Sequence, residues 1–212
     1  MMSLPAPTGT FRWTDTSAGP ALVCDALTPY AAHFFTTRRW KLGLAGSADS
    51  TEGWREVAAA MDVDAGDLVR VHQVHGKAVT VVRRRAGTGS GGVSDVAPPD
   101  ADILIARDPG VALAVQTADC VPILIADRKG AAVAAVHAGW RGLAVSAPIA
   151  AVEALTREFG ARPEDLIAAV GPSIGAARYE VDAAVLSRFE QNGFSAEHIG
   201  RWYYDGERPD HW

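Results

Sequence analysis

Two histidines and one cysteine are the residues of this chain whose types and surroundings point to chemistry. His75 follows a Gln-Val pair, Cys120 ends the run Thr-Ala-Asp-Cys, and His137 opens His-Ala-Gly-Trp-Arg-Gly. Each is expected where a strand meets a turn, and protein sites are usually built at such junctions. Zinc binds imidazole nitrogen and thiolate sulfur, and catalytic zinc commonly has three protein ligands. The three residues therefore form a candidate His-Cys-His metal site.

The spacing of these residues leaves other interpretations open. Cys120 is 45 positions after His75 and 17 positions before His137. These are not zinc-finger spacings, so only the fold could bring the three residues together. One alternative is structural, with Cys120 as a small buried residue and both histidines satisfied by ordinary hydrogen bonds. Another is a Cys120 nucleophile activated by a neighbouring histidine.

Two arginines near these motifs are candidate anion contacts. Arg141 is expected at the start of a helix, where free N–H groups and a guanidinium together would attract phosphate. An internal salt bridge is the ordinary alternative for Arg141. Arg38 lies in a Thr-Thr-Arg-Arg segment, where solvent alone would satisfy the charges. The segment Gly171–Gly175 follows an expected strand and is either a substrate-facing loop or a simple turn.

The elements that must position these residues follow from hydrophobic periodicity. Near-continuous apolar runs between residues 101 and 137 are typical of strands covered on both faces, and apolar residues three and four apart predict helices. Pro148 lies inside one helical pattern, so that helix either begins there or is kinked. Strands are predicted at 21–27, 33–37, 69–75, 77–82, 101–106, 111–116, 121–126, 131–137 and 166–170, and helices at 50–61, 145–159 and 181–191. The order predicts an α+β fold with mixed sheets and helices packed outside, and a polar loop over 83–100.

The composition bounds the class of protein. The 212 residues are 48% hydrophobic and carry a formal net charge of −5, which excludes a disordered chain. The acidic balance argues against nucleic acid or an anionic membrane as a partner. We find no signal peptide and no apolar run of ~18 residues, so a cytoplasmic protein is expected. We also expect a flexible segment over 1–20, one catalytic domain over 21–212, and Cys24 in the core.

Six segments occur in an order that resembles the YfiH/YlmD-type family, long catalogued as multicopper polyphenol oxidase (laccase-like) proteins. They are His33–Arg38, Gln73–Gly76, Asp100–Asp102, Thr117–Pro122, His137–Gly142 and Gly171–Gly175. The resemblance implies an α/β/β/α layered fold and a zinc site of His75, Cys120 and His137, with copper as the other possible metal. It also implies a purine nucleoside phosphorylase with adenosine deaminase and S-methyl-5'-thioadenosine phosphorylase activities in the same site. The substrates would be purine nucleosides and phosphate. Asp119, Cys120 and Arg141 match as catalytic residues, and Arg38, Gln73 and Arg141 match as substrate contacts.

The chain also departs from the family pattern. After Arg38 the family usually has Gly-Gly-x-Ser, where this chain has Arg-Trp-Lys-Leu, so that substrate-side loop is expected to differ. After Gly175 the family often has Pro-Cys-Cys-Tyr-Glu-Val, where this chain has Ala-Ala-Arg-Tyr-Glu-Val. Relative to the family, the chain is expected to be short at its C-terminal end.

Several functions therefore remain open beside the zinc-dependent phosphorylase. The first rival is a copper-dependent polyphenol oxidase, which would need several histidine ligands and usually a methionine. The missing thiols after Gly175 weaken that rival. The second is a hydrolase with Cys120 as nucleophile, and the third is a binding or peptidoglycan precursor editing factor. The oligomeric state, monomer or dimer, is also open.

Overall fold

The computed structural model describes residues 4–43, 50–84 and 98–203. Its strands are β1 (Phe11–Thr16), β2 (Gly19–Cys24), β3 (Leu68–Val69), β4 (Val79–Val82), β5 (Ile103–Ala106), β6 (Ala112–Leu113), β7 (Val121–Asp127), β8 (Val133–Ala138) and β9 (Leu166–Val170). Its α-helices are α1 (Ser50–Ala60), α2 (Trp140–Ala144), α3 (Ala147–Phe159), α4 (Ala183–Gln191) and α5 (Ala196–Trp202). Short 3₁₀ helices form at Arg38–Trp40, Pro163–Asp165 and Ala176–Arg178.

A mixed five-stranded sheet forms the centre of the molecule, with strand order β4-β5-β8-β7-β9. Strands β4 and β5 are parallel, and every other neighbouring pair is antiparallel. In register, Ile103 of β5 lies beside Val136 of β8, and Pro122 of β7 lies beside His137. The ends of β5, β7 and β8 that carry the sequence motifs therefore meet at one edge of the sheet.

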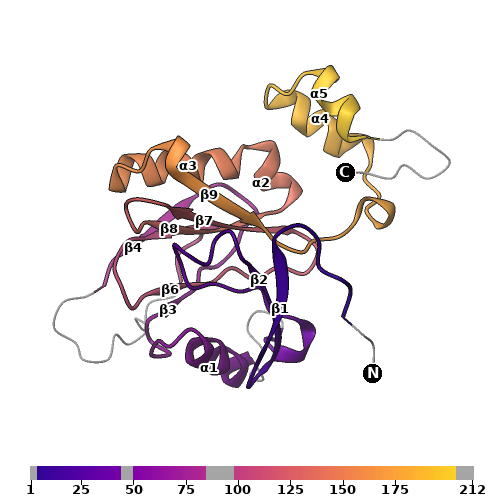
Figure 1. The fold of residues 1–212 in the computed structure, drawn as a ribbon. Helices are drawn as coiled ribbons and strands as arrows, with labels where there is room; N and C mark the ends of the chain where they lie inside the picture. The colour runs from indigo at the N-terminus through magenta and orange to yellow at the C-terminus, as the bar shows by residue number, and fades with distance from the viewer. Residues whose placement is uncertain (1–3, 44–49, 85–97, 204–212) are drawn as a thin grey trace.

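Two smaller sheets cover one face of the central sheet. Strands β1 and β2 form an antiparallel pair, and β3 and β6 form a parallel pair. Helices α2 and α3 lie on the opposite face, and α1 lies outside the small sheets (Figure 1). The order helix, large sheet, small sheets, helix is the predicted α/β/β/α arrangement, so the fold class is confirmed.

The alternation of side chains along β5 explains how one strand serves two cores. Ile103 and Ile105 belong to the cluster formed with α3, whereas Leu104 and Ala106 belong to the cluster formed with β3 and β6. All four residues of β5 are buried. Since successive side chains of a strand point to opposite faces, a continuous apolar run is required when both faces are covered.

Helix α3 settles the ambiguity at Pro148. The helix begins at Ala147, so Pro148 lies in its first turn, where no backbone N–H is lost from the helical ladder. Gly160, in the left-handed conformation with φ of 71°, ends the helix. Leu155 on its inner face is fully buried against the sheet.

Some sequence predictions of local structure are wrong in detail. The predicted strand 33–37 contains only an isolated bridge between Leu22 and Phe35, and the predicted strand 69–75 is regular only at β3. His75 has a φ of 61°, which no strand accommodates. The predicted strand 111–116 is likewise reduced to β6.

The two ends of the described chain differ from expectation as well. Regular structure begins at β1, inside the segment 1–20 that was expected to be flexible, because β1 pairs with β2 over its whole length. Helix α5 lies where no helix was predicted. Most of the predicted loop 83–100 lies outside the described residues. Among the described helices, none has the length and hydrophobicity that a membrane span needs.

Candidate metal centre

The central sheet brings two of the three candidate ligands side by side. His137 is the fifth residue of β8 and is only 3% exposed. Cys120 precedes β7, and because Val121 pairs with Ala138, Cys120 lies opposite Gly139, just beyond His137. In an antiparallel ladder of this register, Cys120 and His137 are diagonal neighbours on one face, close enough for their side chains to reach each other.

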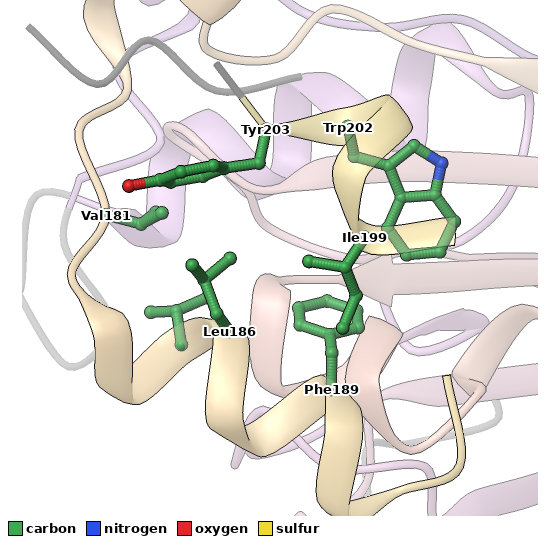
Figure 2. A pocket seen from close by; sticks show the side chains of 7 residues that line it. Val181, Leu186, Phe189, Ile199, Trp202 and Tyr203 are labelled. Atoms are coloured by element: carbon green, nitrogen blue, oxygen red, sulfur yellow. The ribbon is translucent and has the colours of Figure 1, made fainter. Parts of the chain in front are cut away.

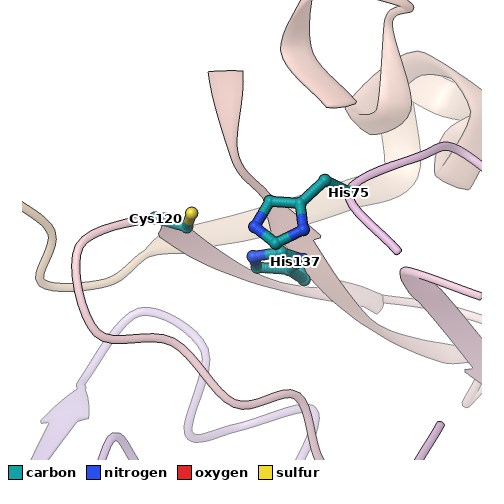
Figure 3. Close-up of side chains that lie close together, drawn as sticks. All are labelled: His75, Cys120 and His137. Atoms are coloured by element: carbon teal, nitrogen blue, oxygen red, sulfur yellow. The ribbon is translucent and has the colours of Figure 1, made fainter. Parts of the chain in front are cut away.

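His75 completes the cluster from the segment that leads into β4. The ligand atoms of His75, Cys120 and His137 all lie within 4.8 Å of one another. The two imidazole rings have centroids 4.8 Å apart and planes at 78°. Figure 3 shows the three side chains turned toward one another, His137 from the strand and His75 from the loop above it. The fold therefore brings together the three residues that the sequence selected.

Gly139 leaves room for this cluster. A Cβ atom built on Gly139 would lie 2.9 Å from Sγ of Cys120 and 3.0 Å from Cδ2 of His75. Its own backbone, with φ of −73° and ψ of 166°, is in a region open to any residue. The glycine is therefore required by the space between the two ligands and not by its conformation.

Burial shifts the pKa values of His75 and of the Cys120 thiol. Burial, together with the nearby His137 and Arg141, lowers the pKa of His75, although the Asp102 carboxylate acts in the opposite direction. Neutral imidazole is the form that ligates metals. Burial, and then the negative charges of Asp119 and Asp102, raise the pKa of the Cys120 thiol.

Asp102 is a residue of the site to which the sequence motifs assigned no role. It is fully buried, and its Oδ1 lies 2.7 Å from Nδ1 of His137. Burial would raise the pKa of Asp102, but hydrogen bonds from His137 and from the backbone N–H groups of Gly76 and His75 outweigh it and lower the pKa. In the sequence, Asp102 directly precedes a continuous apolar run, and a carboxylate there is buried only when it is paired, so this position was the signal that could have identified it.

Arg141 and Asp119 lie at the margin of the cluster. Arg141 is exposed in α2, with its guanidinium carbon 4.3 Å from the centroid of the Trp140 ring. Arg141 lies in the first turn of α2, as expected, but this helix has only five residues, so the guanidinium charge itself is what Arg141 offers an anion. Asp119 is exposed, and its carbonyl oxygen accepts a hydrogen bond from Ile174 N. The loop after β9 is thereby attached to the site.

Tyr179 is a second residue that the sequence motifs left without a role. It is half-buried in the segment after the 3₁₀ helix Ala176–Arg178. Burial and the neighbouring Cys120 and Asp119 raise its pKa, while Arg141 acts to lower it. Cys120 and Arg141 of the site are therefore electrostatic neighbours of the Tyr179 phenol group.

Gln73 and Arg38 lie outside the cluster of three ligands. The amide of Gln73 donates to the carbonyl oxygen of Gln116 at 2.8 Å and accepts from the Gln116 N–H at 2.7 Å. It ties the segment of His75 to the segment before Cys120. Arg38 is exposed in a 3₁₀ helix, and no contact among the described residues joins it to the cluster. Phe35, three residues earlier, contacts Gly171 after β9.

A separate apolar pocket lies in the C-terminal helices (Figure 2). It is lined by Val181, Val185, Leu186, Phe189, Ile199, Trp202 and Tyr203. None of the three ligands lines it. The same helices bury Ala144 and pack against Trp140, both residues of α2. They therefore stabilise the helix that carries Arg141.

The donor set fits a metal ion. Two imidazoles and one thiolate can be brought onto one ion without a change of fold, since their ligand atoms are already within 4.8 Å. With Nδ1 of His137 bonded to Asp102, Nε2 is the ring nitrogen that remains for the metal. The space that a Cβ on Gly139 would fill is kept open beside two of the ligands.

Solved structures share this fold. The crystal structure of Bacillus licheniformis hypothetical protein YfiH superposes with a TM-score of 0.79 at 25% identity, covering 95% of this chain and 79% of that one. YlmD from Geobacillus stearothermophilus gives a TM-score of 0.69 at 28% identity, covering 84% and 71%. Fold and cluster thus define a YfiH-like protein with a His-Cys-His centre.

The family can be stated as well. The family described as multi-copper polyphenol oxidoreductase laccase matches residues 47–209, and the chain belongs to this family. A purine nucleoside phosphorylase of Deinococcus radiodurans is 38% identical over 76% of this chain and 56% of its own length. A purine nucleoside phosphorylase of Bacteroides thetaiotaomicron is 45% identical over 46% of this chain and 36% of its own. Adenosine deaminase RL5 of an unknown prokaryotic organism is 36% identical over 68% and 54%. The chain thus spans less than two thirds of the length of these relatives.

Proposed function

We propose that this chain is a metal-dependent enzyme of purine nucleoside metabolism that cleaves nucleosides with phosphate. The observation that carries the proposal is the convergence of His75, Cys120 and His137 within 4.8 Å, beside the cationic Arg141. The names of its relatives, purine nucleoside phosphorylase and adenosine deaminase, support the same chemistry. We place adenosine deamination and S-methyl-5'-thioadenosine phosphorolysis in the same site.

Zinc is the metal that the donor set favours, held by His75, Cys120 and His137. A blue-copper site adds a weak axial methionine to two histidines and a cysteine. Met61, the one methionine among the described residues, packs in the cluster of α1 instead. When bound, zinc supplies Lewis acidity, which activates water for deamination.

Arg141 and Arg38 are the phosphate contacts in this proposal. A guanidinium pairs with a phosphate through two parallel hydrogen bonds, and both side chains are exposed to incoming substrate. Phosphate oxygen attacks the anomeric carbon of the ribose, the bond from that carbon to the purine nitrogen breaks, and the base leaves. The bonding electrons depart with the base, and the base takes up the proton that the phosphate loses as its ester to the ribose forms.

Asp119 and Gln73 have smaller parts in the proposal. The exposed carboxylate of Asp119, an electrostatic neighbour of Cys120 and Tyr179, would exchange protons with the substrate. Gln73 keeps one amide hydrogen and one lone pair after its two bonds to Gln116. These are the atoms through which Gln73 would contact a nucleoside.

The rival with Cys120 as a hydrolytic nucleophile has less support. A nucleophilic cysteine needs a lowered pKa, whereas burial and two carboxylates raise the pKa of Cys120. A raised pKa does not prevent Cys120 from binding a metal, because the cation itself displaces the thiol proton.

The test is incubation of the zinc-loaded protein with inosine, adenosine and methylthioadenosine, with and without phosphate, followed by mass identification of the products. Release of base that depends on phosphate, together with the pentose 1-phosphate, is the expected result. Cys120→Ala should lose both zinc and activity. Cys24→Ala is the matched control, because Cys24 is buried in another cluster and should keep both. A Cys120→Ala protein with full zinc content and full phosphorolysis would refute the proposal.

A parallel measurement separates zinc from copper. Metal analysis of the protein as isolated is expected to give one zinc per chain. Phenol oxidation in the presence of oxygen, with several copper atoms per chain, would instead establish the oxidase that the family description names.

A further inference from the structure

We propose that Asp102 is the positioning residue of the metal centre, which fixes the ring tautomer of His137 and the backbone turn of His75 with one carboxylate. This inference rests on the proposed function, because it assumes that the His-Cys-His cluster binds a metal. The sequence did not indicate that the positions of His75, Cys120 or His137 depend on Asp102. Four contacts in the structure carry the argument.

Three of the contacts are with consecutive backbone N–H groups. Oδ1 of Asp102 accepts from His75 N at 2.9 Å, and Oδ2 accepts from Gly76 N at 2.6 Å and Val74 N at 3.3 Å. Successive N–H groups around a left-handed residue form a concave nest that binds anions. Here the anion is a side chain of the protein itself.

The nest accounts for the conformation of His75. A φ of 61° is disfavoured for any residue with a Cβ, so it persists only when the surroundings impose it. Three hydrogen bonds to a fixed, fully buried carboxylate supply that constraint. The left-handed turn directs the imidazole of His75 toward Cys120 and His137.

The fourth contact determines how His137 can bind a metal. Its Nδ1 lies 2.7 Å from Oδ1 of Asp102, and a carboxylate can only accept. Nδ1 must then carry the hydrogen, which leaves the lone pair on Nε2 for a metal. The backbone reinforces the pair, because His137 N donates to the Asp102 carbonyl oxygen at 2.8 Å.

The position of Asp102 in the sheet allows its one carboxylate to contact both His137 and the backbone around His75. It directly precedes β5, which lies between β4 and β8. His75 belongs to the segment before β4, and His137 belongs to β8. Asp102 is thus at the junction of the two chain segments that supply the imidazoles.

An amide in place of this carboxylate cannot satisfy both partners. In Asp102→Asn, one side-chain oxygen becomes an NH₂ group. If the NH₂ takes the place of Oδ2, it opposes the N–H donors of Gly76 and Val74. If it takes the place of Oδ1, it opposes the His75 N–H, and Nδ1 of His137 must become an acceptor, so the hydrogen of that ring moves to Nε2, where it blocks metal binding. Either orientation weakens the site while the side-chain volume is unchanged.

The first experiment measures zinc affinity by competition with a chromogenic chelator. We expect Asp102→Asn to weaken zinc binding by ~10–100-fold, the range for partners behind the ligands. Asp100→Asn is the matched control: Asp100 pairs with the exposed His72 at 2.7 Å and should leave zinc affinity unchanged. Wild-type zinc affinity in a folded Asp102→Asn protein would overturn the proposal.

The second experiment needs no metal, and it leaves Asp102 unchanged. Long-range ¹H–¹⁵N correlation spectra of the metal-free wild-type protein distinguish the two histidine tautomers, and His137→Gln identifies the signal. We expect His137 to be the Nδ1–H tautomer at pH values where it is neutral. The Nε2–H tautomer would overturn the proposal. A chain that binds no zinc would refute the metal centre, whereas the tautomer still tests Asp102 independently.

Discussion

Gly139 offers the sharpest test of the metal centre, because replacing it with alanine adds a methyl group to the space between the ligands Cys120 and His75. The new Cβ would lie 2.9 Å from Sγ of Cys120 and 3.0 Å from Cδ2 of His75. Ordinary contacts between carbon atoms begin at about 3.5 Å, so the sulfur and the ring must retreat by roughly 0.5–1 Å. Metal–ligand distances tolerate only about 0.2 Å.

The expected result is a protein that is folded but weak in metal binding. The backbone angles of Gly139 suit alanine, and glycine-to-alanine changes at compatible positions stabilise by about 0.4–1 kcal/mol through the unfolded chain. Because Cys120 and His75 can move away from the new Cβ atom, the free energy of unfolding should change by no more than about 1 kcal/mol. Zinc affinity should fall by roughly 100-fold or more, since even partners behind the ligands are worth ~10–100-fold.

The assay pairs a zinc competition titration with urea unfolding. Gly175→Ala is the control, because a Cβ on Gly175 meets no heavy atom within 4 Å and its φ is −82°. Gly175 lies in the loop after β9 that reaches Asp119, so the control samples the same region. If Gly139→Ala bound zinc as tightly as the wild-type protein, the ligand atoms could not share an ion at this position, and the reasoning would be refuted.

Three further predictions concern the anion contact, the core and the acid range. Arg141→Met should raise the KM for phosphate in the phosphorolysis assay, and an unchanged KM would remove Arg141 from the phosphate site. Leu155→Ala should lower the free energy of unfolding in urea by about 2–5 kcal/mol, because the side chain is fully buried; a smaller loss would mean that α3 collapses onto the sheet. Hydrogen bonds from Lys129 and Arg162 lower the pKa of Asp165. Their stabilisation is complete above the unfolded pKa near 3.9 and is lost as pH falls through the folded value. The stability difference between wild type and Asp165→Asn should accordingly be present at neutral pH and vanish in acid, and a difference that persists in acid would contradict this origin.

The main architecture was predictable because it depends on local apolar patterns. The runs that became β5, β7, β8 and β9 are continuous and apolar, and each was predicted within a few residues of its observed bounds. Such runs need cover on both faces, and the layered fold supplies it. Helix α3 was predictable for the same reason, since its inner residues recur at spacings of three and four.

Local patterns failed where tertiary contacts override them. The segment before His75 has the composition of a strand, but the buried Asp102 carboxylate draws three consecutive N–H groups to itself and ends the strand geometry. Helix α5 was missed because its apolar residues contact α4, as Ile199 does with Phe189. A short helix of this kind is stabilised by its neighbour and not by its own periodicity.

The sequence by itself determined which atoms are available for chemistry: two imidazoles and one thiol at strand ends, with arginines nearby. It could not determine that residues 45 and 17 positions apart along the chain would bring those atoms to one point. Only the tertiary structure decided this, because strand register and one left-handed turn, not spacing along the chain, set distances within 4.8 Å. The structure also decided the role of Asp102, since a carboxylate acts as a positioning group only when burial and specific donors surround it.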